Sequence, residues 1–221
     1  MSSISVYGPT DEAKTEESLP APETAYGSSK LLAENVHRSW QQAAPGRHLL
    51  VLRPVVIFGP GEGGNVTRLV RSLINGYFMY VGNCTARRAG GYVKELCETI
   101  RFAIEYQINS GECSTLLNFS TDSSTPMETF VDTVREVAEV KRRYASLPRC
   151  LVLALSYPIE VVAQILCIKQ PISPTWIRKL SRSTNIEAKG LQTIGYSYHY
   201  SLKTAIEDWK FDVPADFSVH S

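Results

Sequence analysis

The sequence has little of what several protein classes require. Its five cysteines form no Cys-x-x-Cys pair and are odd in number, which excludes a disulfide framework and a zinc site. We expect reduced and mostly buried thiols. Charge of one sign is also lacking, because 23 Lys and Arg balance 22 Asp and Glu to leave a net charge of +1. The chain therefore has no electrostatic basis for binding nucleic acid or an anionic membrane surface.

Long hydrophobic runs are scarce as well. The longest apolar stretch, 150–168, is interrupted by Pro158, Glu160 and Gln164, so we expect no membrane span. The first residues contain no basic region followed by an apolar run, which indicates no secretory signal and favours a cytoplasmic location. Hydrophobic residues nevertheless make up 43% of the chain, which is enough for a packed globular core.

The spacing of apolar residues predicts strands that alternate with helices. The end of a strand at 4–7 is followed by a polar, acidic loop at 9–23 and by a helix that starts near Thr24. The apolar run from His48 to Phe58 indicates one strand buried on both faces. Further helices are predicted near 66–74, 93–104, 127–137 and 202–209, with a short strand at 116–119. This alternation indicates an α/β protein with a largely parallel sheet, and the helix-rich second half indicates a smaller α-rich lobe.

Tyr26 and Lys30 lie four residues apart at the start of a predicted helix, so their side chains share one face. A phenol is a poor base at neutral pH, and a neighbouring ammonium group favours its charged form. Taken alone, Tyr-x-x-x-Lys occurs often by chance and more often marks an ordinary exposed helix face. The surrounding residues therefore have to decide between the two interpretations.

Three segments in a fixed order favour the catalytic interpretation. They are Ser2-Ser3-Ile4-Ser5-Val6-Tyr7-Gly8, Tyr26-Gly27-Ser28-Ser29-Lys30-Leu31-Leu32-Ala33-Glu34 and Leu52-Arg53-Pro54-Val55-Val56-Ile57-Phe58-Gly59-Pro60-Gly61. Their order and spacing resemble the extended short-chain dehydrogenase/reductases, the NAD-dependent epimerase/dehydratase family. The resemblance is strong from Ser2 to about Leu96 and thinner beyond. It implies the C-terminal part of a Rossmann-like parallel sheet with a small α-rich substrate lobe, and NAD or NADP as the cofactor.

The resemblance also implies roles for individual residues. Ser3 is expected to hydrogen-bond the reacting oxygen of the substrate, Tyr26 to donate or accept the proton, and Lys30 to bind the nicotinamide ribose and favour the phenolate. Pro54 is expected beside the cofactor, together with Tyr26 and Lys30. Outside this motif, Ser3 would be interpreted as a strand-end hydroxyl that satisfies local backbone groups. No metal site is expected.

Five further positions match contacts to a nucleotide-sugar substrate. Asn65 and Val66, at the start of a predicted helix, match contacts to the diphosphate, which suits the free amides of a helix N-terminus. Met79 and Val81 match the strand that flanks the base. Arg88 matches a diphosphate-binding arginine, although a plain surface arginine explains it equally well, and both interpretations stay open.

The turn 59–64 formally fits Gly-x-Gly-x-x-Gly, but no acidic residue ends a following strand about 20 positions on, so we do not assign it to a dinucleotide. The family's own glycine fingerprint belongs to an N-terminal half that we expect this chain to lack. Residues 1–64 would then be the C-terminal remnant of the dinucleotide-binding domain, with the Tyr-x-x-x-Lys helix. Residues 65–221 would form mainly the substrate-binding lobe, with 90–120 packing back on the Rossmann part.

The function implied by the resemblance is an NAD(P)-dependent epimerase, dehydratase or ketoreductase that acts on a nucleotide-activated sugar, with this chain an incomplete form and a homodimer left open. Two departures matter: Val56 stands where many such enzymes have asparagine, and Glu95 replaces a common aspartate. Val56 favours, as an alternative, a 3β-hydroxysteroid dehydrogenase-like oxidoreductase. A third interpretation is a catalytically silent remnant that only binds a sugar nucleotide or a partner protein.

Overall fold

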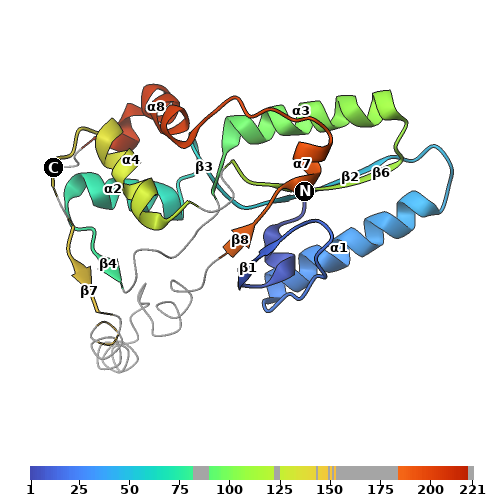
Figure 1. The fold of residues 1–221 in the computed structure, drawn as a ribbon, viewed down its shortest axis with the longest axis horizontal. Helices are drawn as coiled ribbons and strands as arrows, with labels where there is room; N and C mark the ends of the chain where they lie inside the picture. Colours follow the sequence, from blue (N-terminus) through green and yellow to red (C-terminus); the bar gives the residue numbers. More distant parts are fainter. Residues whose placement is uncertain are drawn as a thin grey trace.

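Strands and helices alternate along the chain in the computed structural model, which describes residues 1–81, 90–121, 125–142, 144–148, 150, 152 and 184–218 (Figure 1). The strands are β1 (Thr10–Lys14), β2 (Leu49–Pro54), β3 (Val56–Phe58), β4 (Tyr80–Val81), β5 (Gly90–Tyr92), β6 (Ser114–Phe119), β7 (Ser146–Leu147) and β8 (Thr184–Ile186). The α-helices are α1 (Ala25–Gln42), α2 (Asn65–Asn75), α3 (Val93–Ser110), α4 (Met127–Val137), α7 (Lys189–Thr193) and α8 (Leu202–Asp212), and the 3-10 helices are η1 (Ile4–Tyr7) and η2 (Pro214–Phe217).

Every strand pair in the described residues is parallel. The pairs are β1 with β8, β2 with β6, β3 with β5 and β4 with β7. The β2–β6 pair is the longest, running in register from Leu49 opposite Ser114 to Pro54 opposite Phe119. The predicted α/β fold with a parallel sheet is therefore confirmed.

The hydrophobic core is divided among three groups of buried residues. One lies at the end of the molecule where α2, α4 and α8 gather and is made of Phe58, Val70, Leu73, Tyr92, Val131, Val134, Ala205, Ile206, Trp209 and Phe217 (Figure 1). The second joins β2 and β6 to α3 and α7 through Leu52, Leu96, Ala103, Leu117, Phe119, Ala188, Leu191 and Tyr196. The third packs η1 on the end of β2 through Ile4, Val6, Tyr7, Val55 and Ile186.

Residues 4–7 form the 3-10 helix η1, so their prediction as the end of a strand is wrong. Ser3 caps this helix, and Gly8 ends it with φ +71°, a left-handed conformation that glycine adopts at little cost. Ile4, Val6 and Tyr7 are buried as the apolar pattern indicates. Four residues are too short a stretch for apolar spacing to distinguish a strand from a tight helical turn.

Two other predicted boundaries are also wrong. The predicted single strand 48–58 is two strands, β2 and β3, which meet at Val55. The Val55 N–H still donates to the Phe119 carbonyl of β6 (3.0 Å), whereas residues 56–58 pair with β5. Val56 is 54% exposed, which contradicts burial on both faces. The acidic loop 9–23 contains β1, whose partner β8 lies far away in the sequence and so leaves no local signal.

The thiols are more exposed than predicted. Cys97, Cys113 and Cys150 are free and exposed, and Cys84 and Cys167 lie outside the described residues. Cys97 lies on the exposed side of α3, whereas the two residues before it, Glu95 and Leu96, are buried.

Candidate active site

Tyr26 and Lys30 lie on the first two turns of α1, where Thr24 caps the helix by accepting a hydrogen bond from the Gly27 N–H (3.0 Å). The Lys30 Nζ atom lies 5.6 Å from the centre of the Tyr26 ring, within the range of a cation–π contact. Tyr26 is 55% exposed. The shared helix face expected from the spacing is therefore present, and the phenol is open to solvent.

Ser3 is nearly buried at the start of η1. Its hydroxyl accepts a hydrogen bond from the Ser5 N–H (3.2 Å) and lies 3.1 Å from the Ser5 hydroxyl. The hydroxyl thus caps the 3-10 helix in this structure, and its role in a reaction stays a prediction.

Gly27 brings the segment of Ser3 against the helix of Tyr26. A Cβ atom at this position would lie 2.3 Å from the Ser5 carbonyl oxygen and 3.1 Å from the Pro22 Cβ atom. Only a residue without a side chain allows this approach of two backbones. The first turn of α1 and η1 are therefore in direct backbone contact, next to the two candidate residues Ser3 and Tyr26.

A buried ion pair joins these two segments to β2. The Glu34 carboxylate on α1 accepts two hydrogen bonds from the Arg53 guanidinium on β2, at 2.8 Å from Nε and 2.6 Å from Nη2. The residues are only 3% and 1% exposed. The Ser2 hydroxyl donates to the same carboxylate (2.5 Å), and the half-exposed Arg38 approaches it to 3.5 Å.

The pair continues into a chain of buried hydrogen bonds. Arg53 donates to the Tyr7 hydroxyl (2.7 Å), which donates to the Asn118 side-chain carbonyl on β6 (2.9 Å). Burial raises the pKa of the Tyr7 phenol above its ordinary value, although Arg53 opposes this rise. Burial alone would also raise the pKa of Glu34, but hydrogen bonds from Arg53 and Ser2 outweigh it and hold the pKa below the usual carboxyl value.

The N-terminus of α2 is occupied by a side chain of the preceding turn. The Glu62 carboxylate accepts hydrogen bonds from the Thr67 N–H (2.8 Å), the Thr67 hydroxyl (2.6 Å) and the Val66 N–H (3.4 Å). Burial would raise the pKa of Glu62, but these hydrogen bonds lower it below the ordinary value. Asn65 contacts Arg68, whose Nη2 donates to its side-chain oxygen (2.9 Å). The Glu62 carboxylate therefore binds the N–H groups of the α2 N-terminus, where the sequence analysis predicts a diphosphate contact.

The remaining predicted residues lie in two groups. Pro54 is buried at the end of β2, next to Arg53, and so belongs to the part of the molecule that holds η1 and α1. Met79 is exposed just before β4, and Val81 is the last residue of that strand. In Figure 1, β4 lies near α2. Arg88 lies outside the described residues. The structure therefore brings Ser3, Tyr26, Lys30 and Pro54 into one region, and Asn65, Val66, Met79 and Val81 into another.

A family model matches the first half of the chain. Residues 1–114, more than half of the chain, match the model of the NAD dependent epimerase/dehydratase family. The chain belongs to this family. The matched residues include all three motif segments, so the resemblance stated from the sequence is confirmed.

Solved epimerase structures share the fold of this family member. UDP-glucuronic acid 4-epimerase from Bacillus cereus, a structure that contains NAD, superposes with a TM-score of 0.70 at 17% identity over 98% of this chain and 61% of that one. UDP-N-acetylglucosamine 4-epimerase from Bacillus cereus gives a TM-score of 0.67 at 20% identity over 95% of this chain and 62% of that one. These similarities confirm the Rossmann-like α/β fold.

One curated relative is similar over most of the chain. The N-acetyl-alpha-D-glucosaminyl-diphospho-ditrans,octacis-undecaprenol 4-epimerase of Escherichia coli O157:H7 is 28% identical over 207 residues, which are 93% of this chain. The epimerase/dehydratase chain spans 62% of the length of that relative.

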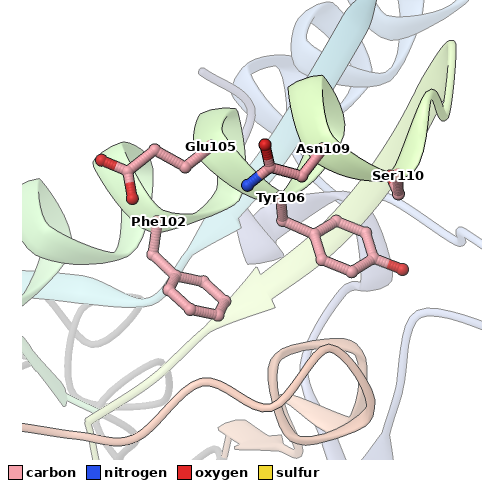
Figure 2. A pocket seen from close by; sticks show the side chains of 5 residues that line it. All are labelled: Phe102, Glu105, Tyr106, Asn109 and Ser110. Carbon is pink, nitrogen blue, oxygen red and sulfur yellow. The ribbon is translucent and has the colours of Figure 1, made fainter.

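A hollow of about 350 Å³ lies on α3, and none of its lining residues is a predicted site residue. Figure 2 shows the five side chains that line it, all from this one helix: Phe102, Glu105, Tyr106, Asn109 and Ser110. Across the described ranges, no three His, Cys, Asp or Glu side chains are grouped to hold a metal ion. No helix among the described residues is long and apolar enough to cross a membrane.

Sequence reasoning missed three residues of the site. Glu34 follows Tyr26 and Lys30 at the same spacing of four, which could have signalled that it extends their helix face. Arg53 interrupts an apolar strand, and a charged residue in such a place signals a buried partner. Nothing in the sequence could have identified Glu62, because only the folded conformation of the turn 59–64 places its carboxylate at the N-terminus of α2.

Proposed function

We propose that this chain belongs to an NAD-dependent 4-epimerase that acts on a hexose linked through a diphosphate. The observation that carries the proposal is the exposed Tyr26 beside Lys30, on the turn of α1 whose Gly27 packs against the Ser5 carbonyl in the segment of Ser3. Such a constellation suits proton transfer at an alcohol oxygen. The names of the relatives support the choice of reaction, because all three described above are 4-epimerases of sugars attached to a diphosphate group.

In this proposal the Tyr26 hydroxyl exchanges a proton with the hexose O4 atom, and Ser3 hydrogen-bonds that oxygen once its hydroxyl turns away from Ser5. Lys30 holds the phenol and a ribose hydroxyl in place. NAD, when bound, supplies the acceptor and donor of hydride at C4.

The residues present fit only one end of that cofactor. Tyr26, Lys30 and Pro54 would hold the nicotinamide riboside, because the phenol is open and the ammonium lies beside it. The glycine turn 59–64 is not assigned to the pyrophosphate, because no acidic residue follows it at the spacing that ribose recognition needs. In this proposal residues 1–64 serve the cofactor, residues 65–221 mainly bind the substrate, and residues 90–120 pack back on the first part.

The substrate diphosphate is proposed to bind near Asn65, Val66 and Arg88, where it would displace the Glu62 carboxylate from the amides of Val66 and Thr67. The base or lipid would lie beyond it, near Met79 and Val81. The name of the Escherichia coli relative favours a second form of substrate, in which a polyprenol replaces the nucleoside. Both forms share a hexose diphosphate. A homodimer is proposed through α1, whose exposed Leu32, Val36 and Trp40 recur at a spacing of four and form one apolar stripe.

The test is turnover and binding with the purified chain, NAD and either UDP-N-acetylglucosamine or its undecaprenyl diphosphate counterpart, with the C4 epimer quantified by chromatography. Because the residues present fit only one end of NAD, we expect the epimer to form slowly and only at high NAD concentration. Tyr26→Phe should abolish this turnover while the Kd for the sugar stays within about twofold, because a single proton-transfer group contributes at least a hundredfold to rate. Equal turnover of Tyr26→Phe and wild type would refute the mechanism. Binding without turnover by the wild-type chain would assign it substrate binding alone.

A further inference from the structure

The buried Glu34–Arg53 pair joins the three segments that carry the proposed catalytic residues. Ser2, which donates to Glu34, directly precedes Ser3. Glu34 itself lies one turn of α1 beyond Lys30 on the helix face of Tyr26. Arg53 directly precedes Pro54. One carboxylate therefore ties η1, α1 and β2 together at the residues next to the site.

The segment of Ser3 is held at both of its ends. Before η1, the Ser2 N–H donates to the Leu52 carbonyl (2.8 Å) and the Ser2 hydroxyl to Glu34. At the end of η1, the Tyr7 hydroxyl lies 2.7 Å from Arg53 Nη1, and the guanidinium carbon lies 4.8 Å from the centre of the Tyr7 ring. Ser3 lies between these two attachments, and both lead to the same ion pair.

Stability alone does not account for such a pair. Two charges lose their hydration when they are buried, and a well-packed apolar pair of similar size is commonly as stable or more stable. Hydrogen bonds have a preferred direction, so they fix the orientation and register of two segments, which apolar packing does not. Loss of register of about 1 Å at a reacting group can cost roughly a hundredfold in rate.

We propose that Glu34 and Arg53 are positioning residues, which hold the Ser3 hydroxyl in register with Tyr26 and Lys30 through Ser2 and Tyr7. This inference rests on the proposed function, because Ser3 and Tyr26 are assigned there. Neither Glu34 nor Arg53 is exposed enough to touch a substrate, so any effect on the reaction has to pass through the segments that they hold.

The test removes the attachment through Ser2. Ser2→Ala deletes the hydroxyl that joins the Ser3 segment to Glu34, and Thr99→Val deletes an equally buried hydroxyl in α3, which bonds the Glu95 carbonyl (2.9 Å), as the matched control. We expect Ser2→Ala to lower kcat about tenfold or more while KM for UDP-N-acetylglucosamine changes less than twofold, because only the register of reacting groups is altered. Thr99→Val should destabilise the protein to a similar degree and leave kcat unchanged. An equal fall in kcat for both variants would overturn the proposal.

A second measurement does not depend on turnover. Amide hydrogen exchange of the peptide 2–8 reports the hydrogen bonds of η1, in which the Val6 N–H donates to the Ser3 carbonyl and the Gly8 N–H to the Ser5 carbonyl. Exchange of this peptide should be faster in Ser2→Ala than in wild type, while Thr99→Val changes only the α3 peptide. Unchanged exchange of 2–8 in Ser2→Ala would overturn the positioning role, even in a chain without turnover. Absence of turnover in wild type with the expected exchange would refute the proposed function alone.

Discussion

Removal of one partner from the Glu34–Arg53 pair should destabilise the protein far more than removal of both. In Arg53→Met the Glu34 carboxylate stays buried with only the Ser2 hydroxyl and the more distant Arg38 near it. An uncompensated buried charge of this kind costs about 3–5 kcal/mol of unfolding free energy. For a chain of this size, that loss corresponds to a fall in Tm of roughly 6–20 °C. The converse variant Glu34→Leu leaves Arg53 with the Tyr7 hydroxyl alone and should lose a similar amount.

The double variant Glu34→Leu with Arg53→Met should recover most of that stability. No buried charge remains, and the net cost is the Ser2 hydroxyl that has lost its acceptor, about 1 kcal/mol, since Tyr7 keeps Asn118 as its acceptor. Urea unfolding at neutral pH, with a constant m-value across the four proteins, measures the coupling energy of this cycle. Single losses of about 3–5 kcal/mol each and a double loss of about 1 kcal/mol give an expected coupling of about 5–9 kcal/mol. Additive losses, with the double variant less stable than either single one, would refute the reasoning about buried charge.

Three further predictions concern pH, the substrate side and the backbone contact. The pKa of Glu34 in the folded protein lies below its ordinary value of 4.5, so its ionised form contributes stability above pH 4.5, and this contribution is lost as the pH falls through the lowered pKa. On acidification, wild type should therefore lose unfolding free energy relative to the double variant. Urea titrations from neutral pH to about pH 3 will measure this difference. Glu62→Gln removes the charge that competes for the amides of Val66 and Thr67, so UDP-N-acetylglucosamine should bind several times more tightly by calorimetry, and weaker binding would exclude a diphosphate at this helix end. Gly27→Ala should lower the unfolding free energy by about 1–3 kcal/mol despite the better helix propensity of alanine, because its Cβ atom would lie 2.3 Å from the Ser5 carbonyl oxygen. The control is Ser28→Ala, at an exposed position on the same turn, which should change the unfolding free energy little.

Features that depend on neighbours in the sequence were predicted well. The start of α1 at its Thr24 cap, the common face of Tyr26 and Lys30, and the start of α8 after Ser201 all follow from side chains within one helical turn. The family assignment depended in the same way on short motifs in a fixed order. Helical geometry is local, so residue identity and spacing suffice to determine it.

Features that depend on distant neighbours were not predictable. Residues 4–7 are apolar in either conformation, and only their packing on Val55 and Ile186 makes a 3-10 helix the favourable one. β1 forms because residues 184–186 pair with it. The run 48–58 forms two strands because its first part pairs with β6 and its last part with β5. The same holds for Glu34 and Arg53, which are ordinary charged residues in the sequence. Their burial, and therefore their energetic weight, arises only when α1, β2 and η1 pack together, because the cost of removing a charge from water depends on everything that surrounds it.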